Sequence, residues 1–105
     1  MNRQGGYRRE VNGLTFDFGT ASYGGKSVRL TRSECVILKA LAEASPKPCT
    51  LSRLLWLLHP DKEEDYVSRL NIKVHIFRIR RKLKDTGIPL RIEARRGFGY
   101  RCVFS

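Results

Sequence analysis

The chain contains few acidic residues for its length. Of its 105 residues, 10 are Asp or Glu and 21 are Lys or Arg, which gives a formal net charge of +11. A chain with this excess of positive charge is expected to bind a polyanion, and nucleic acid is the leading candidate. A membrane surface is the rival, but the hydrophobic residues recur in several separate segments and not along one amphipathic helix. The composition therefore favours nucleic acid over a membrane.

Long hydrophobic runs are also absent. No stretch approaches the length needed to span a bilayer, and residues 1–6 lack the apolar run of a signal peptide. We therefore expect a cytoplasmic protein in which residues 1–6 form a frayed tail and residues 7–105 form one domain.

Cysteine and histidine are scarce. Cys35, Cys49 and Cys102 have no CxxC spacing and no histidine at metal-ligand spacing, so we expect small buried side chains and neither a metal nor a cofactor. His59 and His75 fall on different predicted elements, with no carboxylate predicted beside either. Because acid–base catalysis needs such groups to converge, we do not expect an enzyme.

Apolar residues alternate with polar ones over residues 7–30. Asn12-Gly13 and Gly24-Gly25 interrupt the alternation with residue pairs that favour tight hairpin turns. The pattern predicts an antiparallel sheet, and it places Phe16 and Phe18 in the core.

The apolar period changes to about 3.6 residues at Thr31. Thr31 and Glu34 form a capping box at the start of a helix that has to end near Ser45, because prolines follow. A shorter helix is predicted from Leu51 to about Leu58, and a longer one over residues 66–84. The expected inward side chains of the three helices are Cys35, Leu38, Leu41, Ala42, Leu54, Leu55, Leu58, Ile72, Ile76, Ile79 and Leu83.

The end of the chain is typical of a β-hairpin. Alternating residues at 90–94 and 100–104 flank the turn sequence Arg96-Gly97-Phe98-Gly99. The predicted order is strands, three helices and a hairpin, which is an α+β fold.

The third predicted helix has an unbalanced charge. Seven basic residues and no acidic residue lie between Val67 and Lys84. Such a run can simply solvate an exposed face, but uncompensated charge on a folded helix costs self-repulsion and favours an anionic partner. The residues expected to contact DNA from this helix are Lys73, Val74, His75, Phe77, Arg78, Arg80 and Arg81. In a major groove, arginine can donate to guanine while apolar groups touch the thymine methyl group.

In its ordered motifs the chain resembles the OmpR/PhoB-type winged-helix effector domains of bacterial response regulators. The similarity covers about Leu14 to Val103. It rests on Leu30-Thr31-Arg32-Ser33-Glu34, Thr50 with Leu54-Leu55, the run from Val74 to Leu83, and Arg96-Gly97-Phe98-Gly99-Tyr100-Arg101. The resemblance implies a four-stranded N-terminal sheet, a helix-turn-helix core and a C-terminal hairpin wing.

The resemblance also implies roles for single residues. The helix at 66–84 would enter the major groove, with base contacts from Lys73, Arg78 and Phe77. Phosphate contacts would come from His75 and Arg80. The wing at 95–101 would reach the minor groove through Arg96, and Thr50 completes the expected DNA contacts. Relatives commonly have polar or basic residues at the positions of Leu70 and Phe77, so a more thymine-rich target is expected here.

Two surfaces are expected to contact proteins. The loop at 59–68, which contains Asp61, Glu63 and Glu64, corresponds to the surface that some relatives use to contact RNA polymerase. Trp56 and Leu57 on the second helix are candidate contacts for a partner or for a second copy on tandem DNA sites, although packing against the loop or sheet is the alternative.

Other functions remain open at the level of sequence. An RNA-binding or ribosome-associated protein would stack bases on sheet aromatics, for which Phe16, Phe18 and Tyr23 are available. A winged helix used only for protein contact would show no salt-dependent affinity for nucleic acid. Most relatives also carry an N-terminal receiver domain, so the chain is expected to be either an excised domain or a stand-alone regulator of bacterial transcription, associated with the nucleoid when bound.

Overall fold

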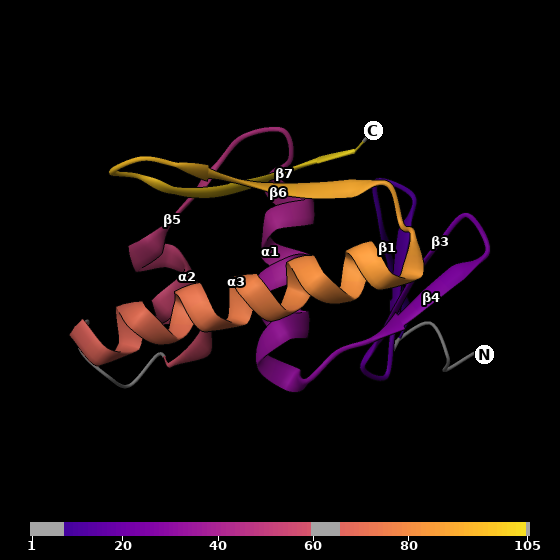
Figure 1. The fold of residues 1–105 in the computed structure, drawn as a ribbon, viewed down its shortest axis with the longest axis horizontal. Helices are drawn as coiled ribbons and strands as arrows, with labels where there is room; N and C mark the ends of the chain where they lie inside the picture. Colours follow the sequence, from indigo (N-terminus) through magenta and orange to yellow (C-terminus); the bar gives the residue numbers. More distant parts are fainter. Residues whose placement is uncertain (1–7, 60–65, 105) are drawn as a thin grey trace.

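The computed structural model describes residues 8–59 and 66–104, with side chains described for residues 9–59 and 71–104 (Figure 1). The strands are β1 (Arg8–Val11), β2 (Leu14–Asp17), β3 (Thr20–Tyr23), β4 (Lys26–Arg29), β5 (Cys49–Thr50), β6 (Leu90–Arg95) and β7 (Gly99–Phe104), and the helices are α1 (Arg32–Ala44), α2 (Leu51–Leu58) and α3 (Tyr66–Thr86). This α+β architecture confirms the predicted winged helix. The expected tail at residues 1–6 lies outside the described residues.

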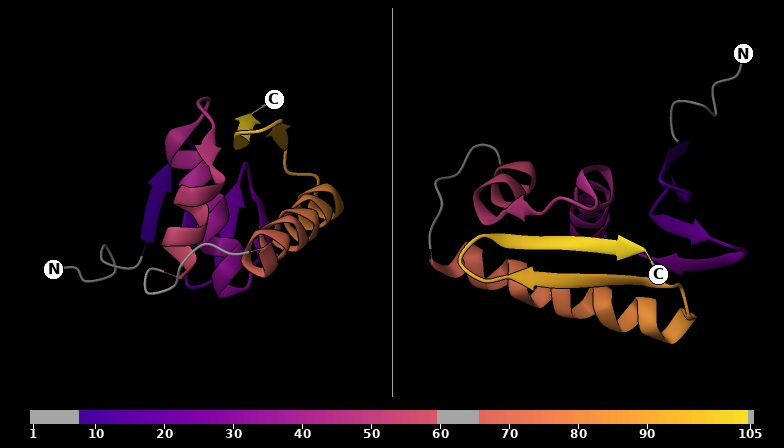
Figure 2. Two further views of the ribbon diagram at one scale, coloured as in Figure 1. Left: turned by 90° about the vertical axis from the view of Figure 1, so that its left-hand side faces the viewer. Right: turned by 90° about the horizontal axis from the view of Figure 1, so that it is seen from above.

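The elements form two sheets around three helices. The four-stranded sheet has the order β1-β2-β3-β4 and lies at one end of the molecule, while the three-stranded sheet has the order β5-β7-β6 (Figures 1 and 2). The β6–β7 hairpin runs along α3, and its tip lies at the same end of the molecule as the N-terminal half of α3 (Figure 2). The predicted wing and the predicted recognition helix are therefore neighbours.

The N-terminal sheet is a series of two-residue hairpins. Asn12-Gly13 and Gly24-Gly25 form turns with positive φ, as predicted, and Phe18-Gly19 forms a third with φ of 47° and 79°. Two positive φ angles match the type I′ turn that joins twisted strands. The expectation that Phe18 lies in the core was wrong, because β2 ends at Asp17 and the turn leaves Phe18 78% exposed. Phe16, within the strand, is buried.

Helix α1 begins with the predicted capping box. The Thr31 hydroxyl oxygen accepts from the Glu34 amide at 3.2 Å, and the Glu34 carboxylate accepts from the Thr31 amide at 2.9 Å. Helix α2 begins after Thr50 as predicted, and α3 extends two residues beyond the expected end at Lys84.

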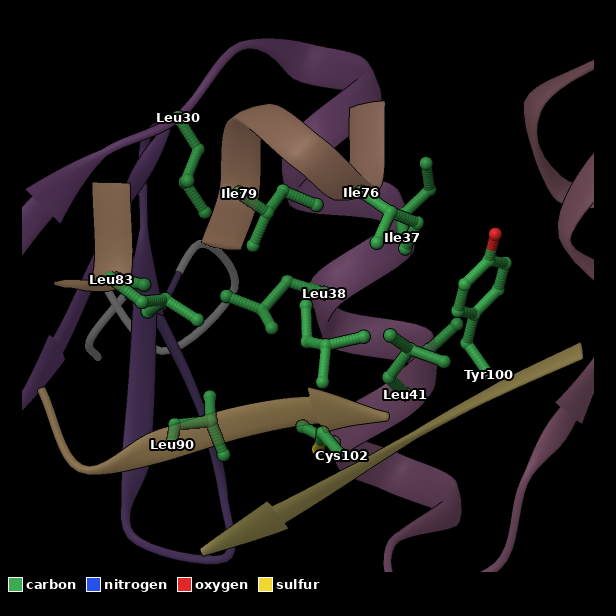
Figure 3. Packing of buried hydrophobic residues seen from close by; sticks show 14 of the residues in the cluster. Leu30, Ile37, Leu38, Leu41, Ile76, Ile79, Leu83, Leu90, Tyr100 and Cys102 are labelled. Carbon is green, nitrogen blue, oxygen red and sulfur yellow. The ribbon is translucent and has the colours of Figure 1, made fainter. Parts of the chain in front are cut away.

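The core lies between α1, α3 and the hairpin. Figure 3 shows side chains from these three elements pointing toward one another, including Leu38, Ile79 and Leu90. The four predicted inward residues of α3 are all buried: Ile72, Ile76, Ile79 and Leu83. Cys35 was expected in the inward stripe of α1 but is only half-buried, because the inward face centres on Ile37 instead. Cys49 and Cys102 are buried as predicted.

Strand β5 was not predicted. Cys49 and Thr50 pair with Tyr100 and Gly99 of β7, and the Leu51 amide donates to the Phe98 carbonyl oxygen at 3.2 Å. The pairing requires glycine at position 99, since a Cβ built there would lie 1.8 Å from the Cys49 carbonyl oxygen. The backbone at the start of α2 is thereby hydrogen-bonded to residues 98–100, at and beside the hairpin tip.

Candidate nucleic-acid interface

The face of α3 opposite its buried stripe is open to solvent. Val74 is 43% exposed and Phe77 is 60% exposed. Lys73, Arg78 and Arg81 are also exposed on this helix. None of the described strands therefore covers these five predicted DNA-contacting side chains. We call this set the outer face of α3.

The cations of the outer face are uncompensated. Within the described part of the chain, Lys73, Arg78 and Arg81 have no hydrogen-bond or salt-bridge partner. Their side chains are long and exposed, so they can reorient toward an anionic ligand without first breaking a bond to any described residue. The outer face combines donors suited to phosphate or guanine with an apolar patch.

Arg80 lies beside the outer face but is bonded to the protein. Its Nε and Nη2 atoms donate to the Ile92 carbonyl oxygen of β6 at 3.1 Å and 2.8 Å. The guanidinium group thus joins α3 to the hairpin. Sequence reasoning gave Arg80 only a phosphate role and missed this bond, because the acceptor is a backbone atom and leaves no signal in side-chain identity.

Lys82 is also occupied, by a carboxylate from another helix. Its Nζ lies 2.6 Å from Oε1 of Glu34, which is 1% exposed. Burial by itself would raise the pKa of Glu34, but the hydrogen bond from Lys82 and the Thr31 amide outweigh it, so the pKa is lowered and Glu34 is ionised at neutral pH. The view of α3 as wholly uncompensated was therefore wrong for Lys82: its partner comes from α1, which a count of acidic residues within one helix cannot find.

His75 is half-buried on the flank of α3 that faces α1. Its Nδ1 atom is buried and has no hydrogen-bond partner among the described residues. Burial lowers the pKa of His75, the nearby Arg78 and His59 lower it further, and Glu34 partly opposes the shift. At neutral pH, His75 is therefore mainly a neutral side chain that offers one N–H donor and no positive charge.

The hairpin tip is strongly basic. Glu93 accepts from Nε of Arg101 at 2.9 Å and lies 3.3 Å from Nη2 of Arg91. The hydrogen bond with Arg101 lowers the pKa of Glu93 and keeps it ionised. This acidic residue compensates cations in the middle of the hairpin. Arg95 and Arg96 at the tip are exposed and have no such partner in the described residues.

Comparison with known proteins identifies the family. The family model described as "Transcriptional regulatory protein, C terminal" matches residues 25–102. The chain belongs to this family. It is a winged-helix, DNA-binding regulatory domain of the OmpR/PhoB type, in which the β6–β7 hairpin is the wing.

Three relatives illustrate the match. The sensory transduction protein BceR of Halalkalibacterium halodurans is 33% identical over 93 residues, which are 84% of this chain and 38% of BceR. The DNA-binding domain of Klebsiella pneumoniae RstA, solved in complex with the RstA box, is 27% identical with a TM-score of 0.67, covering 93% of this chain and 96% of that one. DrrB, a Thermotoga maritima OmpR/PhoB homologue, is 31% identical with a TM-score of 0.63, covering 93% and 44%. The chain thus spans little more than a third of the length of BceR.

The remaining predicted site residues lie on or beside α2. Thr50 is half-buried, and its hydroxyl oxygen accepts from the Arg53 amide at 3.0 Å, which leaves the hydroxyl hydrogen free to donate. Trp56 is 59% exposed, whereas Leu57 is half-buried against the core. Asp61, Glu63 and Glu64 lie outside the described residues.

Two further features of the described residues bear on the interface. None of their helices is both long and apolar enough to cross a membrane. No group of three or more His, Cys, Asp or Glu side chains within the same ranges is arranged to hold a metal ion.

Proposed function

We propose that this domain binds double-stranded DNA in a sequence-specific manner, with α3 in the major groove and the wing in the minor groove. The observation that carries the proposal is the open outer face of α3, whose cations have no partner in the described part of the protein. The RstA domain is in complex with the RstA box, which supports duplex DNA as the ligand class here. The domain, residues 7–105, acts without catalysis, in the cytoplasm and on the nucleoid.

The base contacts of α3 come from the outer face. Arg78 and Lys73 donate to guanine. The planar guanidinium group of Arg78 can form two parallel hydrogen bonds to O6 and N7 of the base. Phe77 and Val74 supply apolar contact. A helix of 21 residues is about 32 Å long and the major groove is about 12 Å wide, so the exposed side of α3 can lie in the groove while its buried stripe packs on the protein.

The phosphate contacts flank these base contacts. Arg81 offers a cation with no partner among the described residues, His75 offers a neutral N–H donor, and Thr50 offers a hydroxyl at the start of α2. Arg80 keeps its remaining N–H groups for phosphate while it holds the Ile92 carbonyl oxygen. Such contacts fix the register of a protein on the duplex and carry no direct sequence information.

The wing contacts the adjacent minor groove through Arg96. An arginine on a narrow turn can enter the groove where the negative potential is strongest, which is over A·T-rich sequence. Support comes from the charge arrangement of the hairpin, in which Glu93 compensates the middle and leaves the tip positive.

Selection of bound duplexes from a randomised pool tests the proposed function. We expect enrichment of a defined sequence, and competition by that duplex but not by duplex RNA or by either single strand. Equal competition by RNA would instead support the RNA-binding alternative. That alternative already lacks much of its predicted stacking surface, since Phe16 is buried and the Tyr23 ring packs on Phe104 with centroids 5.6 Å apart.

We further propose that protein contacts are made by residues that do not belong to the outer face of α3. The acidic residues Asp61, Glu63 and Glu64 are the expected contact for RNA polymerase, and the exposed Trp56 is the expected contact for a second copy on tandem sites. Substituting Trp56 by Ala should leave binding to a single site unchanged and reduce cooperativity on two sites. Unchanged cooperativity would exclude this role.

A further inference from the structure

Apolar side chains interrupt the most basic surface of the domain. Five large hydrophobic side chains are exposed in the described residues: Phe18, Trp56, Val74, Phe77 and Phe98. Two of these, Val74 and Phe77, lie three residues apart on the outer face of α3. Residues at this spacing are neighbours on a helix, so the two side chains form one apolar patch among Lys73, Arg78 and Arg81.

The apolar patch of Val74 and Phe77 needs an apolar partner, which a phosphate group is not. Exposed apolar surface gains free energy only when it is removed from water, and phosphate oxygens are strongly hydrated anions. Base edges in the major groove are mostly hydrogen-bonding groups, which neither Val74 nor Phe77 can satisfy. The exception is the C5-methyl group of thymine, which is apolar and projects into the groove.

We propose that Val74 and Phe77 are specificity-determining residues that pack on thymine C5-methyl groups, while Arg78 binds a neighbouring guanine. Arg78 follows Phe77 directly and lies one helical turn after Val74, so the apolar patch and the guanidinium group reach neighbouring positions of the groove. The inference rests on the proposed function and adds the sequence class of the site: thymine steps next to guanine.

The test isolates the methyl group. In a duplex selected by the wild-type domain, each thymine is replaced in turn by deoxyuridine, which removes only the C5-methyl group and keeps base pairing. Wild-type affinity should fall about fourfold at one or two thymines, the effect of one buried methylene-sized group, and remain unchanged at the others.

The protein variants assign each methyl group to a side chain. Phe77→Ala should bind the thymine duplex more weakly and show no further loss when the thymine under Phe77 becomes uracil. Val74→Ala should behave in the same way at the other position. Because neither substitution removes a charge, the dependence of affinity on salt concentration should stay as in the wild type.

Trp56→Ala is the matched control. Trp56 and Phe77 are aromatic residues with nearly equal exposure, 59% and 60%, but Trp56 lies on α2. On a duplex that carries one site, where no second copy binds, the Trp56→Ala variant should retain every uracil penalty of the wild type. Thermal unfolding should show that neither variant is destabilised, since both side chains are largely outside the core.

The outcomes separate this inference from the proposed function. If the randomised pool yields no enriched sequence, the proposed function fails. If a sequence is enriched but uracil is tolerated at every thymine, methyl recognition is excluded while sequence-specific binding stands. If Phe77→Ala retains the wild-type penalties, Phe77 is excluded as the side chain that recognises a methyl group.

Discussion

The outer face of α3 and its flanks carry the same kinds of cation but use them differently. On the outer face, Arg78 and Arg81 have no partner within the described residues. On the flanks, Arg80 holds the Ile92 carbonyl oxygen and Lys82 holds the buried Glu34 carboxylate. The acceptors come from the hairpin and from α1. A count of charges along a helix therefore overestimates the cations that are available to a ligand, and the packing of neighbouring elements decides which ones remain.

The largest effect is expected when a flank cation loses its partner. Glu34→Gln should lower the free energy of unfolding by about 3 kcal/mol, since it leaves Lys82 without a carboxylate beside a buried site. Chemical denaturation measures the loss. Glu43→Gln is the control from the same helix: the Arg9–Glu43 pair is 3.1 Å apart but at the surface, so the loss should stay below about 1 kcal/mol.

The contribution of Glu34 to stability should also depend on pH. The pKa of Glu34 is lower in the folded protein than its ordinary value of 4.5. The contribution of Glu34 to stability is therefore fully present above pH 4.5 and is lost as the pH falls through the lowered pKa of the folded state. The Glu34→Gln variant should lack this part of the acid sensitivity. An identical acid profile in wild type and variant would contradict the assigned charge state.

An outer-face cation should affect binding and not stability. Arg78→Ala should weaken binding to the selected duplex by about 1 to 3 kcal/mol and relax the preference at one base pair, because a paired base contact is lost. Titration of selected and random duplexes measures the effect. Arg9→Ala removes the same charge from the N-terminal sheet and controls for net charge. Equal losses on both duplexes would reject a base-specific role for Arg78.

Arg80 is bonded to the protein and also has N–H groups to offer to DNA. It therefore tests the comparison between the flanks and the outer face of α3 most directly. Arg80→Ala should lower the slope of log affinity against log salt by roughly one if its free N–H groups contact a phosphate. It should also lower the free energy of unfolding by about 1 kcal/mol, because the Ile92 carbonyl oxygen loses its partner. A stability loss with an unchanged slope would place Arg80 wholly among the structural cations.

The smallest effect is expected at the wing. Arg96→Ala should weaken binding by about 0.5 kcal/mol, since the guanidinium group is exposed at the wing tip and its attraction to the DNA is screened by water and salt. The loss should be confined to duplexes with an A·T-rich flank. Footprinting of the minor groove should show reduced protection there, and an unchanged footprint would remove the wing from the proposed interface.

Local signals in the sequence were enough for much of the fold. The capping box at Thr31, the buried spacing from Ile72 to Leu83 and the Asn12-Gly13 turn each depend on residues close together in the chain. Phe18 was misplaced because alternation alone does not show where a strand stops. Strand β5 was missed since its two residues pair with a segment about fifty positions away, and nothing in their types indicates it.

In the candidate site, too, local patterns predicted some features, while features that depend on distant residues were missed. The exposure of the outer face follows from helical periodicity and was predicted correctly. Arg80 and Lys82 form hydrogen bonds with a carbonyl oxygen and a carboxylate that are distant in sequence, so no pattern within α3 could show these bonds. The individual DNA contacts of Arg78, His75 and Arg96 stay predictions until a bound duplex is examined.

The close approach of Gly99 to Cys49 limits how this domain can tolerate spacing in its target. With β5 paired to β7, backbone hydrogen bonds join the start of α2 to the residues at and beside the wing tip. If α3 lies in the major groove and the wing in the minor groove, as proposed, this pairing would hold the two contacts at one separation. One inserted base pair lengthens a duplex by about 3.4 Å, and the domain would have to give up one contact to keep the other.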